Sequence, residues 1–450
     1  MLKRFAVKNF LSFGEEVTFT MEPGKVRGRR EHLLEHRGCN LLRFSAIYGS
    51  NAAGKSNYVR AIRFARDTIL HGMQKNTMTR YHRVDPENKE KPTEFTFEIR
   101  LDKKKYRYQF GLNMYSGMFL YESLVDFSTG KEKEIFTRDM SQHKQHIMSL
   151  AKDAASNIRI QTYLGDMPED SNILFLKEMN RNKAQAYDVI PELHVFKDVY
   201  IWFKEKLRII YPEEHLEITQ PKLFEESESE SICEMLQNFS LHITDTAVES
   251  VSFESIFSSV PGQFPPKFFE DFKNNIYQAI QEAKKKHPEA EKMSHTLRVG
   301  ADLYSVNLDE GDQLVLNRLQ LVHGGNGQFN ISEESDGTRR LIELMDILLS
   351  EENDVTYIVD EIDRSLHPLI TKHFVELFLA NEKNRQRQLI VTTHESRLLD
   401  LDVLRKDEIW FMVKNDGMSQ LERLVSYNIR TDLKIDMAYL RGKIVQVPCW

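Results

Sequence analysis

The sequence predicts an α/β protein in which a mixed sheet with helices and an antiparallel β-subdomain are interrupted by a mainly helical insertion. Strand-like and helix-like segments alternate near both ends of the chain, which is typical of a parallel sheet covered by helices. Residues 93 to 128 alternate apolar and polar side chains with turn signals between the runs, which predicts an antiparallel sheet. From about 140 to 295 the chain is mostly charged and compatible with helix.

The first elements can be assigned in chain order. "LKRFAVKNFLSFGEEVTFT" alternates in two short runs around "SFGEE", which predicts a β-hairpin or meander. "NLLRFSAIYG" predicts a buried strand that ends at Gly49, and the next segment places Val59, Ile62, Ala65 and Ile69 at helical spacing. The predicted order is therefore strand, glycine loop, helix.

The later elements complete the same core. Strands return at "HTLRVGADLYSVNL", and "DVTYIVDEID", "RQLIVTTHE" and "DEIWFMV" follow as strands between helical segments. We therefore expect the two ends of the chain to form one core. The predicted division is 1–135 and 297–425 for the two parts of this core, 136–296 for the insertion and 426–450 for a C-terminal tail.

Composition limits the class of protein. The 450 residues are 41% apolar and 29% charged, an ordinary balance for a globular protein. The formal charge of −7 argues against a generally basic surface that coats nucleic acid, although a local basic patch can coexist with it. Three separated cysteines form no disulfide framework, and no stretch is apolar enough to span a membrane. We expect a cytoplasmic protein.

A phosphate-binding loop is predicted between the first buried strand and the helix that follows. "GSNAAGKS" fits the pattern G-x-x-x-x-G-K-[ST] in the strand-loop-helix context that this pattern requires. Its backbone N–H groups and the helix N-terminus would surround phosphates, Lys55 would reach the β- and γ-phosphates, and Ser56 would ligate Mg²⁺. A plain glycine turn is the alternative. The predicted nucleotide-binding residues are Gly49, Ser50, Asn51, Ala52, Ala53, Gly54, Lys55, Ser56 and Asn57.

Two later strands end in residues suited to hydrolysis. "TYIVDEID" ends in Asp360, which would hold Mg²⁺, and Glu361, which would orient or deprotonate the attacking water. "QLIVTTHES" ends in His394, whose ring could contact a γ-phosphate or that water. Solvated charges and an exposed or structural histidine are the alternatives. The segment "SLHPLI" lies between these two strands. It is explained largely by a helix cap at Ser365 with Pro368 in the first turn.

The stretch "EESDGTRRL" supports two interpretations. Ser335 or Asp336 could simply cap the helix "TRRLIELMDILL". A helix N-terminus with a serine hydroxyl, Gly337 and open N–H groups is also an anion site. In a chain that already has one phosphate loop, the second interpretation predicts a composite site shared between copies.

The ordered set "NFLSF", "GSNAAGKS", "ESDGT", "IVDEID" and "TTHES" resembles the ABC-type ATPase heads of the SMC, RecF and OLD group. The "NF-SF" strand, the "ESDGTRRL" signature and the closing "AYLRGKIVQVP" look most like the AAA ATPases of bacterial anti-phage abortive-infection systems, with RloA and the ATPase subunits of PARIS and Septu as comparisons. The resemblance covers roughly residues 1 to 70 and 300 to 450.

The resemblance implies an ATPase that uses ATP and Mg²⁺. Two heads of a homo-oligomer would sandwich ATP, with the phosphate loop of one copy facing Ser335, Asp336 and Gly337 of the other. Lys55, Glu361 and His394 would be catalytic, Ser56 and Asp360 would hold Mg²⁺, and Ser365 would lie at the dimer seam. The glutamine of the family's Q-loop stays unassigned, because Gln109 and the strand near "FLYES" are equally good positions.

Three hypotheses for function follow. The first is an ATPase sensor or regulator of anti-phage defence that controls a separately encoded effector, expected to be a nuclease, in response to a phage-derived trigger. Only fifty-six residues follow His394, without a second acidic cluster. The alternative is a RecF- or SMC-like repair or recombination ATPase that binds DNA, for which "KVRGRREHLLEHR" is a candidate phosphate contact. The third, an interaction scaffold with a decayed site, fits poorly with the intact motif residues.

Overall fold

A computed structural model gives the fold of the chain. The structure describes residues 1–34, 40–140, 144–147, 154–165, 167, 172–181, 183–212, 233–239, 241–256, 266–286, 295–309, 311–325, 327–381, 386–427, 435–442 and 444.

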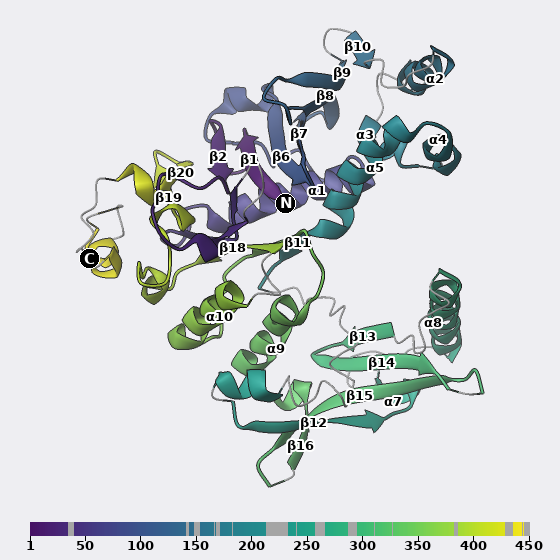
Figure 1. Cartoon of the computed structure of the whole chain (residues 1–450), viewed down its shortest axis with the longest axis vertical. Helices are drawn as coiled ribbons and strands as arrows, with labels where there is room; N and C mark the ends of the chain where they lie inside the picture. Colours follow the sequence, from purple (N-terminus) through teal and green to yellow (C-terminus); the bar gives the residue numbers. More distant parts are fainter. Residues whose placement is uncertain are drawn as a thin grey trace. The chain divides into compact units, whose positions relative to one another are not determined.

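The chain divides into two compact units, each assembled from separate segments of the sequence. Unit 1 comprises Met1–Pro212, Glu352–Asp363 and Val375–Trp450, and unit 2 comprises Glu213–Glu351 and Arg364–Phe374. The two ends of the sequence therefore share unit 1, as the sequence predicts. Within it, β2 of the N-terminal segment lies beside β20 of the C-terminal segment (Figure 1).

A six-stranded sheet in unit 1 carries the predicted parallel arrangement. Its order is β11 (Leu207–Ile210), β17 (Val355–Val359), β18 (Arg387–Thr393), β5 (Phe44–Tyr48), β19 (Ile409–Asn415) and β20 (Met418–Arg423). All neighbours are parallel except the hairpin β19–β20. The three central strands are buried at every residue, which is why their sequences are almost continuously apolar. The carboxyl ends of β5, β17 and β18 meet at one edge.

A seven-stranded antiparallel sheet completes the framework of unit 1. Its order is β10 (Lys144–Ile147), β9 (Lys133–Asp139), β8 (Met118–Asp126), β7 (Lys104–Asn113), β6 (Thr93–Leu101), β1 (Leu2–Lys8) and β2 (Val17–Thr20). This confirms the predicted N-terminal hairpin and the antiparallel sheet after residue 93. The short strands β3 (Leu33–Leu34) and β4 (Leu41–Leu42) pair separately.

Helix α1 (Lys55–His71) connects the two sheets through one core. The predicted apolar face is buried, and the cluster that contains it includes residues of both sheets. Tyr58 packs edge-on against Phe5 of β1 with 5.4 Å between ring centroids, and its hydroxyl donates to the Phe5 carbonyl at 3.1 Å. Phe19 and Trp410 close the core between β2 and β19 at 5.1 Å. Burial of this many aromatic rings fixes the start of α1 against both sheets.

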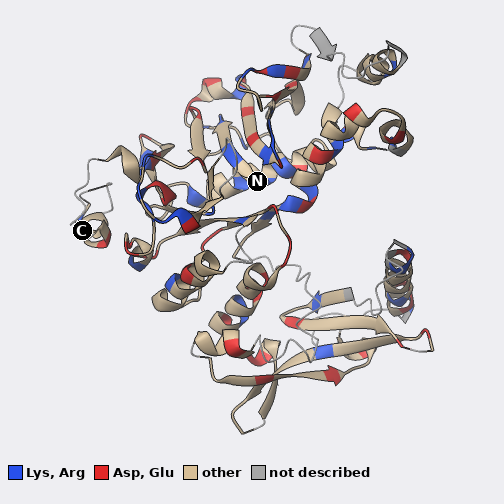
Figure 2. Cartoon of the chain, in the orientation of Figure 1, with Lys and Arg blue, Asp and Glu red and all other residues tan. Residues whose placement is uncertain are grey.

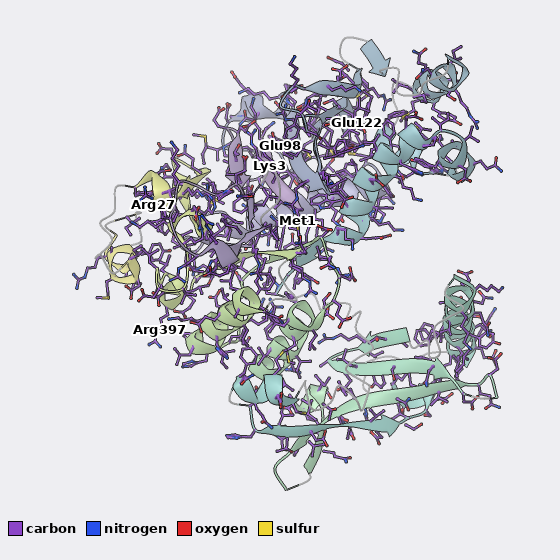
Figure 3. All side chains as sticks on the ribbon, in the orientation of Figure 1. Met1, Lys3, Arg27, Glu98, Glu122 and Arg397 are labelled. Atoms are coloured by element: carbon purple, nitrogen blue, oxygen red, sulfur yellow. The ribbon has the colours of Figure 1, made fainter. Side chains whose placement is uncertain are left out.

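The other helices of unit 1 are short. They are α2 (Ala154–Gly165), α3 (Phe175–Met179), α4 (Ala184–Val189), α5 (His194–Ile201) and α11 (Ile435–Leu440). A π-helical turn, Trp202–Lys206, continues α5 directly into β11. Glu122 of β8, fully buried, accepts the backbone N–H groups of Phe175 and Leu176 at 2.6 and 3.0 Å and so caps α3 (Figure 3).

Unit 2 pairs a five-stranded antiparallel sheet with helices. The strands run in the order β12 (Ile243–Ser250), β15 (Leu314–His323), β14 (Asp302–Leu308) and β13 (His295–Val299), with β16 (Gly327–Asn330) also on β15. The helices are residues 233–238, α7 (Phe253–Ile256), α8 (Pro266–Lys286) and α9 (Asp336–Leu349). Helix α10 (Pro368–Ala380) begins in unit 2 and ends in unit 1.

The predicted boundaries at 135, 296 and 425 remain predictions, and the compact units divide the chain elsewhere. The segment 136–296 contains the helices α2 to α8, but also β11, which belongs to the parallel sheet, and β12, which belongs to unit 2. The charged local sequence does not predict these strands, because their partners lie at least 67 residues away. Among the described residues, no helix is long and apolar enough to cross a membrane.

Candidate functional site

The loop between β5 and α1 has a conformation that only its glycines permit. Gly54 has φ of +115°, and a Cβ at this position would lie 2.3 Å from the Ser419 hydroxyl oxygen. A Cβ at Gly49 would lie 2.7 Å from the Met412 carbonyl oxygen. Both glycines of the predicted motif are therefore required by backbone angle or space, in addition to any phosphate approach.

The loop is held from behind by polar side chains that the motif does not include. The Ser419 hydroxyl donates to the Ala53 carbonyl at 2.6 Å, and the Ser419 backbone N–H donates to the Ser12 carbonyl at 2.8 Å. Asn57 donates to the Ser12 hydroxyl at 3.0 Å. The "NFLSF" turn and β20 thus fix the loop, while Asn51 and Ala52 at its tip are exposed.

Lys55 lies inside the loop, next to His394. Its ammonium donates to the carbonyls of Gly49 and Ser50 at 2.8 and 3.2 Å, and its Nζ is 3.3 Å from His394 Nδ1. Burial lowers the pKa of Lys55 to about 8, against the opposing charges of Asp360, Asp363 and Glu361. Lys55 therefore remains mainly charged at neutral pH.

His394 is the neutral member of this basic pair. Burial and the adjacent Lys55 charge lower its pKa below the ordinary value of 6.5. Since Lys55 has only donors, Nδ1 of His394 accepts and its proton is assigned to Nε2. The side chain can then donate one hydrogen bond from Nε2, as a contact to phosphate or water requires. Its backbone N–H faces both oxygens of Asp363, at 3.2 and 3.3 Å.

The two carboxylates after β17 differ in their surroundings. Asp360 is buried, and its Oδ1 accepts the Thr392 hydroxyl at 2.5 Å. Glu361 is partly exposed and has φ of +48°, a left-handed conformation uncommon for glutamate. Its backbone N–H donates to the same Thr392 hydroxyl at 2.8 Å. A buried acid followed by a more accessible one suits a metal ligand and a water-orienting base.

The parallel sheet thus gathers the predicted loop, acids and histidine in unit 1. The N-terminus of α1, the Lys55 ammonium and the Ser56 side chain suit a nucleotide phosphate chain. Among the described residues, no three His, Cys, Asp or Glu side chains form a ready metal site. Mg²⁺ commonly uses one or two carboxylates together with phosphate oxygens and water, so Asp360 with Ser56 fits this ion.

The residues Ser335, Asp336 and Gly337 belong to unit 2. Ser335 is the N-cap of α9, and its hydroxyl accepts the Thr338 backbone N–H at 3.2 Å, which confirms the capping interpretation. A Cβ at Gly337 would lie 2.8 Å from the Ser365 carbonyl oxygen, so this glycine also has a packing role. The function of these residues toward nucleotide stays a prediction.

The predicted cap by Ser365 is wrong. Helix α10 begins at Pro368, as expected, but the side chain at its start is His367, whose Nδ1 accepts the Leu369 N–H at 3.3 Å. Ser365 is exposed with φ of +62°. Pro368 moves the helix start later than the serine, because the residue before a proline disfavours helical backbone angles.

Sequence reasoning missed the supports of the site. Thr392, Asp363 and Ser12 lie within the quoted stretches "TTHES", "IVDEID" and "NFLSF" but had no role assigned to them, and Ser419 lies outside every quoted stretch. The one signal was the polar end of β18, where two threonines interrupt an apolar run directly before His394. Gln109 lies mid-strand in β7, paired with Thr96 and Ser123, and no described contact joins it to the site.

Comparison with known proteins gave one family match and a distant structural likeness. The model of the family described as "AAA domain, putative AbiEii toxin, Type IV TA system" matches residues 44–142 and 174–400, more than half of the chain. No curated protein matched. The SMC head domain from Thermotoga maritima is 13% identical over 94% of this chain and 98% of that one, with a TM-score of 0.35. That score is too low to equate individual elements.

Proposed function

Because the chain belongs to this family of AAA domains, we propose that it binds ATP with Mg²⁺ and hydrolyses ATP to ADP and phosphate. The observation that carries the proposal is the convergence of Lys55, Asp360, Glu361 and His394 at one edge of the parallel sheet. The distance of 3.3 Å between Lys55 Nζ and His394 Nδ1 joins residues 339 positions apart in sequence.

The chain's own residues have separate tasks in this mechanism. The loop from Gly49 to Ser56 and the N-terminus of α1 bind the phosphates through backbone N–H groups, and Lys55 contributes a charged donor. Ser56 and Asp360 would hold Mg²⁺, which would neutralise charge on the phosphates. Glu361 orients the attacking water and accepts its proton, while the Nε2–H of His394 donates toward the γ-phosphate or the water.

The same proposal includes a composite site and a role in defence. Ser335, Asp336 and Gly337 of one copy face the γ-phosphate held by another copy, so that ATP pairs two heads. The cap of α9 leaves a polar N-terminus suited to an anion. The family description names a toxin of a toxin–antitoxin system, which supports a cytoplasmic regulator of anti-phage defence that controls a separately encoded nuclease in response to a phage-derived trigger.

Two substitutions test hydrolysis. Lys55→Ala removes the charged phosphate donor, and we expect it to abolish ATP binding and protection against phage. Glu361→Gln keeps the shape of the side chain without a basic carboxylate, and we expect turnover to fall by at least about 100-fold while ATP-bound oligomers accumulate. Phosphate release and size-exclusion chromatography with ATP measure both effects. Wild-type turnover by Glu361→Gln would refute its proposed role.

The effector requires a separate measurement. Glu361→Gln, expressed with its chromosomal neighbours and purified with ATP, should retain the partner chain, which mass spectrometry identifies. The matched Lys55→Ala preparation should lose it if the association depends on ATP. Equal recovery from the two variants would show that nucleotide does not control the association.

A basic loop favours the alternative of a DNA-binding repair or recombination ATPase. Lys25, Arg27 and Arg30 are exposed, and Arg27 is labelled in Figure 3. The buried Arg405 holds the backbone beneath them, because its guanidinium donates to the Gly28 carbonyl at 2.6 Å. These cations therefore occupy a fixed turn and form a candidate contact for DNA phosphates.

A further inference from the structure

The hydroxyl of Thr392 contacts both acidic residues of the candidate site. Thr392 lies near the end of β18 and is 1% exposed. The hydroxyl donates to Asp360 Oδ1 at 2.5 Å and accepts the backbone N–H of Glu361 at 2.8 Å. One side chain thus joins the proposed metal ligand to the proposed water-orienting base.

The backbone of Thr392 adds a further hydrogen bond to the turn that contains Glu361. Its carbonyl accepts the Ile362 N–H at 3.1 Å, so Glu361 and Ile362 are both tied to one residue of the neighbouring strand. Glu361 has φ of +48°, a conformation that costs free energy for a non-glycine residue and persists only when its surroundings hold it. Two residues later in the turn, Asp363 accepts the His394 backbone N–H.

We propose that Thr392 is a positioning residue that aims the Asp360 carboxylate at Mg²⁺ and holds Glu361 in its active conformation. The inference rests on the proposed ATPase function and deepens it. A threonine hydroxyl has one donor and two acceptor positions, so it can serve both neighbours at once. With Oδ1 engaged by Thr392, Oδ2 of Asp360 is the oxygen left to ligate the metal.

Substitution of Thr392 separates this role from ordinary packing. Thr392→Val keeps the β-branched shape and removes both hydrogen bonds, while Thr392→Ser keeps the hydroxyl. Thr393→Val is the matched control, because Thr393 is equally buried on the same strand and its hydroxyl accepts the Glu395 N–H at 3.0 Å rather than contacting the two acids.

Two measurements are needed on each full-length variant. The first is the Mg²⁺ concentration that half-saturates binding of a fluorescent ATP analogue, and the second is kcat at saturating Mg²⁺ and ATP. Loss of an outer-shell partner typically costs about 10- to 100-fold in metal affinity or activity. We expect Thr392→Val to show a shift of this size in both quantities, Thr392→Ser to recover most of it, and Thr393→Val to leave the Mg²⁺ requirement unchanged.

The outcomes distinguish this inference from the proposed function. If the wild type hydrolyses ATP in a Glu361-dependent manner and Thr392→Val matches it in both measurements, the positioning role is overturned. Equal losses in the two valine variants, with no change in Mg²⁺ requirement, would also overturn it. If the wild type binds ATP without hydrolysing it, the proposed function fails, and the Mg²⁺ titration still tests Thr392 through Asp360. Should Thr392→Val not fold, Thr392→Cys, a weak donor of similar size, takes its place.

Discussion

At the scale of single residues, the site places two basic side chains next to each other, and only one of them, Lys55, is charged at neutral pH. Lys55 Nζ and His394 Nδ1 lie 3.3 Å apart, and simultaneous protonation would place like charges next to each other in a partly desolvated environment. Burial lowers both pKa values, and the charge of Lys55 lowers that of His394 further. The result at neutral pH is a charged lysine beside a neutral histidine, which are the protonation states that phosphate binding and hydrogen-bond donation require.

A second residue-scale feature is the buried carboxylate of Glu98. It accepts Lys3 Nζ at 2.7 Å and Arg107 Nε at 3.1 Å and is 3% exposed, between β1 and β7 (Figure 3). Burial alone would raise its pKa, but the hydrogen bonds and charges of Lys3 and Arg107 lower it below the ordinary value of 4.5. The charged Glu98 carboxylate therefore stabilises the folded protein through its contacts with Lys3 and Arg107.

We expect Glu98→Gln to destabilise the protein by about 3 kcal/mol at pH 7, because it leaves buried cations without a partner. A carboxylate with a lowered folded pKa contributes fully above pH 4.5, and the contribution is lost as pH falls through the folded value. The difference from wild type in urea unfolding should accordingly shrink as the pH falls below 4.5. Glu16→Gln, at an exposed ion pair with Arg4, serves as control and should cost under about 1 kcal/mol. A difference for Glu98→Gln that does not vary with pH would contradict this account.

At the scale of elements, the start of α9 combines a cap with a packing contact. Ser335 caps the helix, and Gly337 approaches the Ser365 carbonyl too closely for any side chain. Substitution of Gly337 would disturb unit 2 whether or not nucleotide binds there. Ser335 is the better position for a test of the composite site, because other residue types can cap a helix equally well.

Two substitutions of Ser335, by asparagine and by aspartate, have nearly the same shape as each other. They separate the capping role of Ser335 from its proposed role at a γ-phosphate. Asparagine and aspartate are both strong N-caps, so we expect Ser335→Asn and Ser335→Asp to have similar melting temperatures. If Ser335 faces a γ-phosphate in the paired state, the negative charge of aspartate should abolish ATP-dependent pairing, whereas asparagine should preserve it. Light scattering of each variant with ATP in a Glu361→Gln background measures pairing. Equal pairing by both variants would leave Ser335 as a helix cap alone.

At the scale of the whole molecule, charge is mixed rather than segregated. Figure 2 shows Lys and Arg interspersed with Asp and Glu within each unit, consistent with the net charge of −7. Such a surface generates no strong positive field toward DNA. The loop that presents Lys25, Arg27 and Arg30 is a local basic cluster, which makes the DNA-binding alternative directly testable.

The alternative function predicts duplex DNA binding that weakens with salt. Replacement of Lys25, Arg27 and Arg30 by glutamate should then reduce affinity and lower the slope of log affinity against log salt by about 3, since each phosphate contact contributes nearly one. Fluorescence anisotropy at several salt concentrations measures this. Replacement of Lys103, Lys104 and Lys131, which are exposed on other loops or strand ends, provides a charge-matched control. Absence of binding by the wild type at low salt would exclude the alternative.

The sequence by itself determined the elements that are coded locally. Continuous apolar runs identified β5, β17 and β18, helical spacing identified α1, and glycine spacing identified the loop before it, because each pattern depends on neighbours within a few residues. The same patterns placed Lys55, Asp360, Glu361 and His394 at the ends of adjacent elements, where parallel strands bring them to one edge.

Only the tertiary structure decided which residues support the site and how the chain divides. Thr392, Ser12 and Ser419 act through hydrogen bonds to residues far away in sequence. Such contacts leave no periodic pattern in the sequence. Strand β11 has the same origin: four residues within a charged segment become part of the parallel sheet through pairing with β17 about 150 positions later. Long-range pairing selects these residues, and a local pattern cannot specify a partner that the chain meets only when folded.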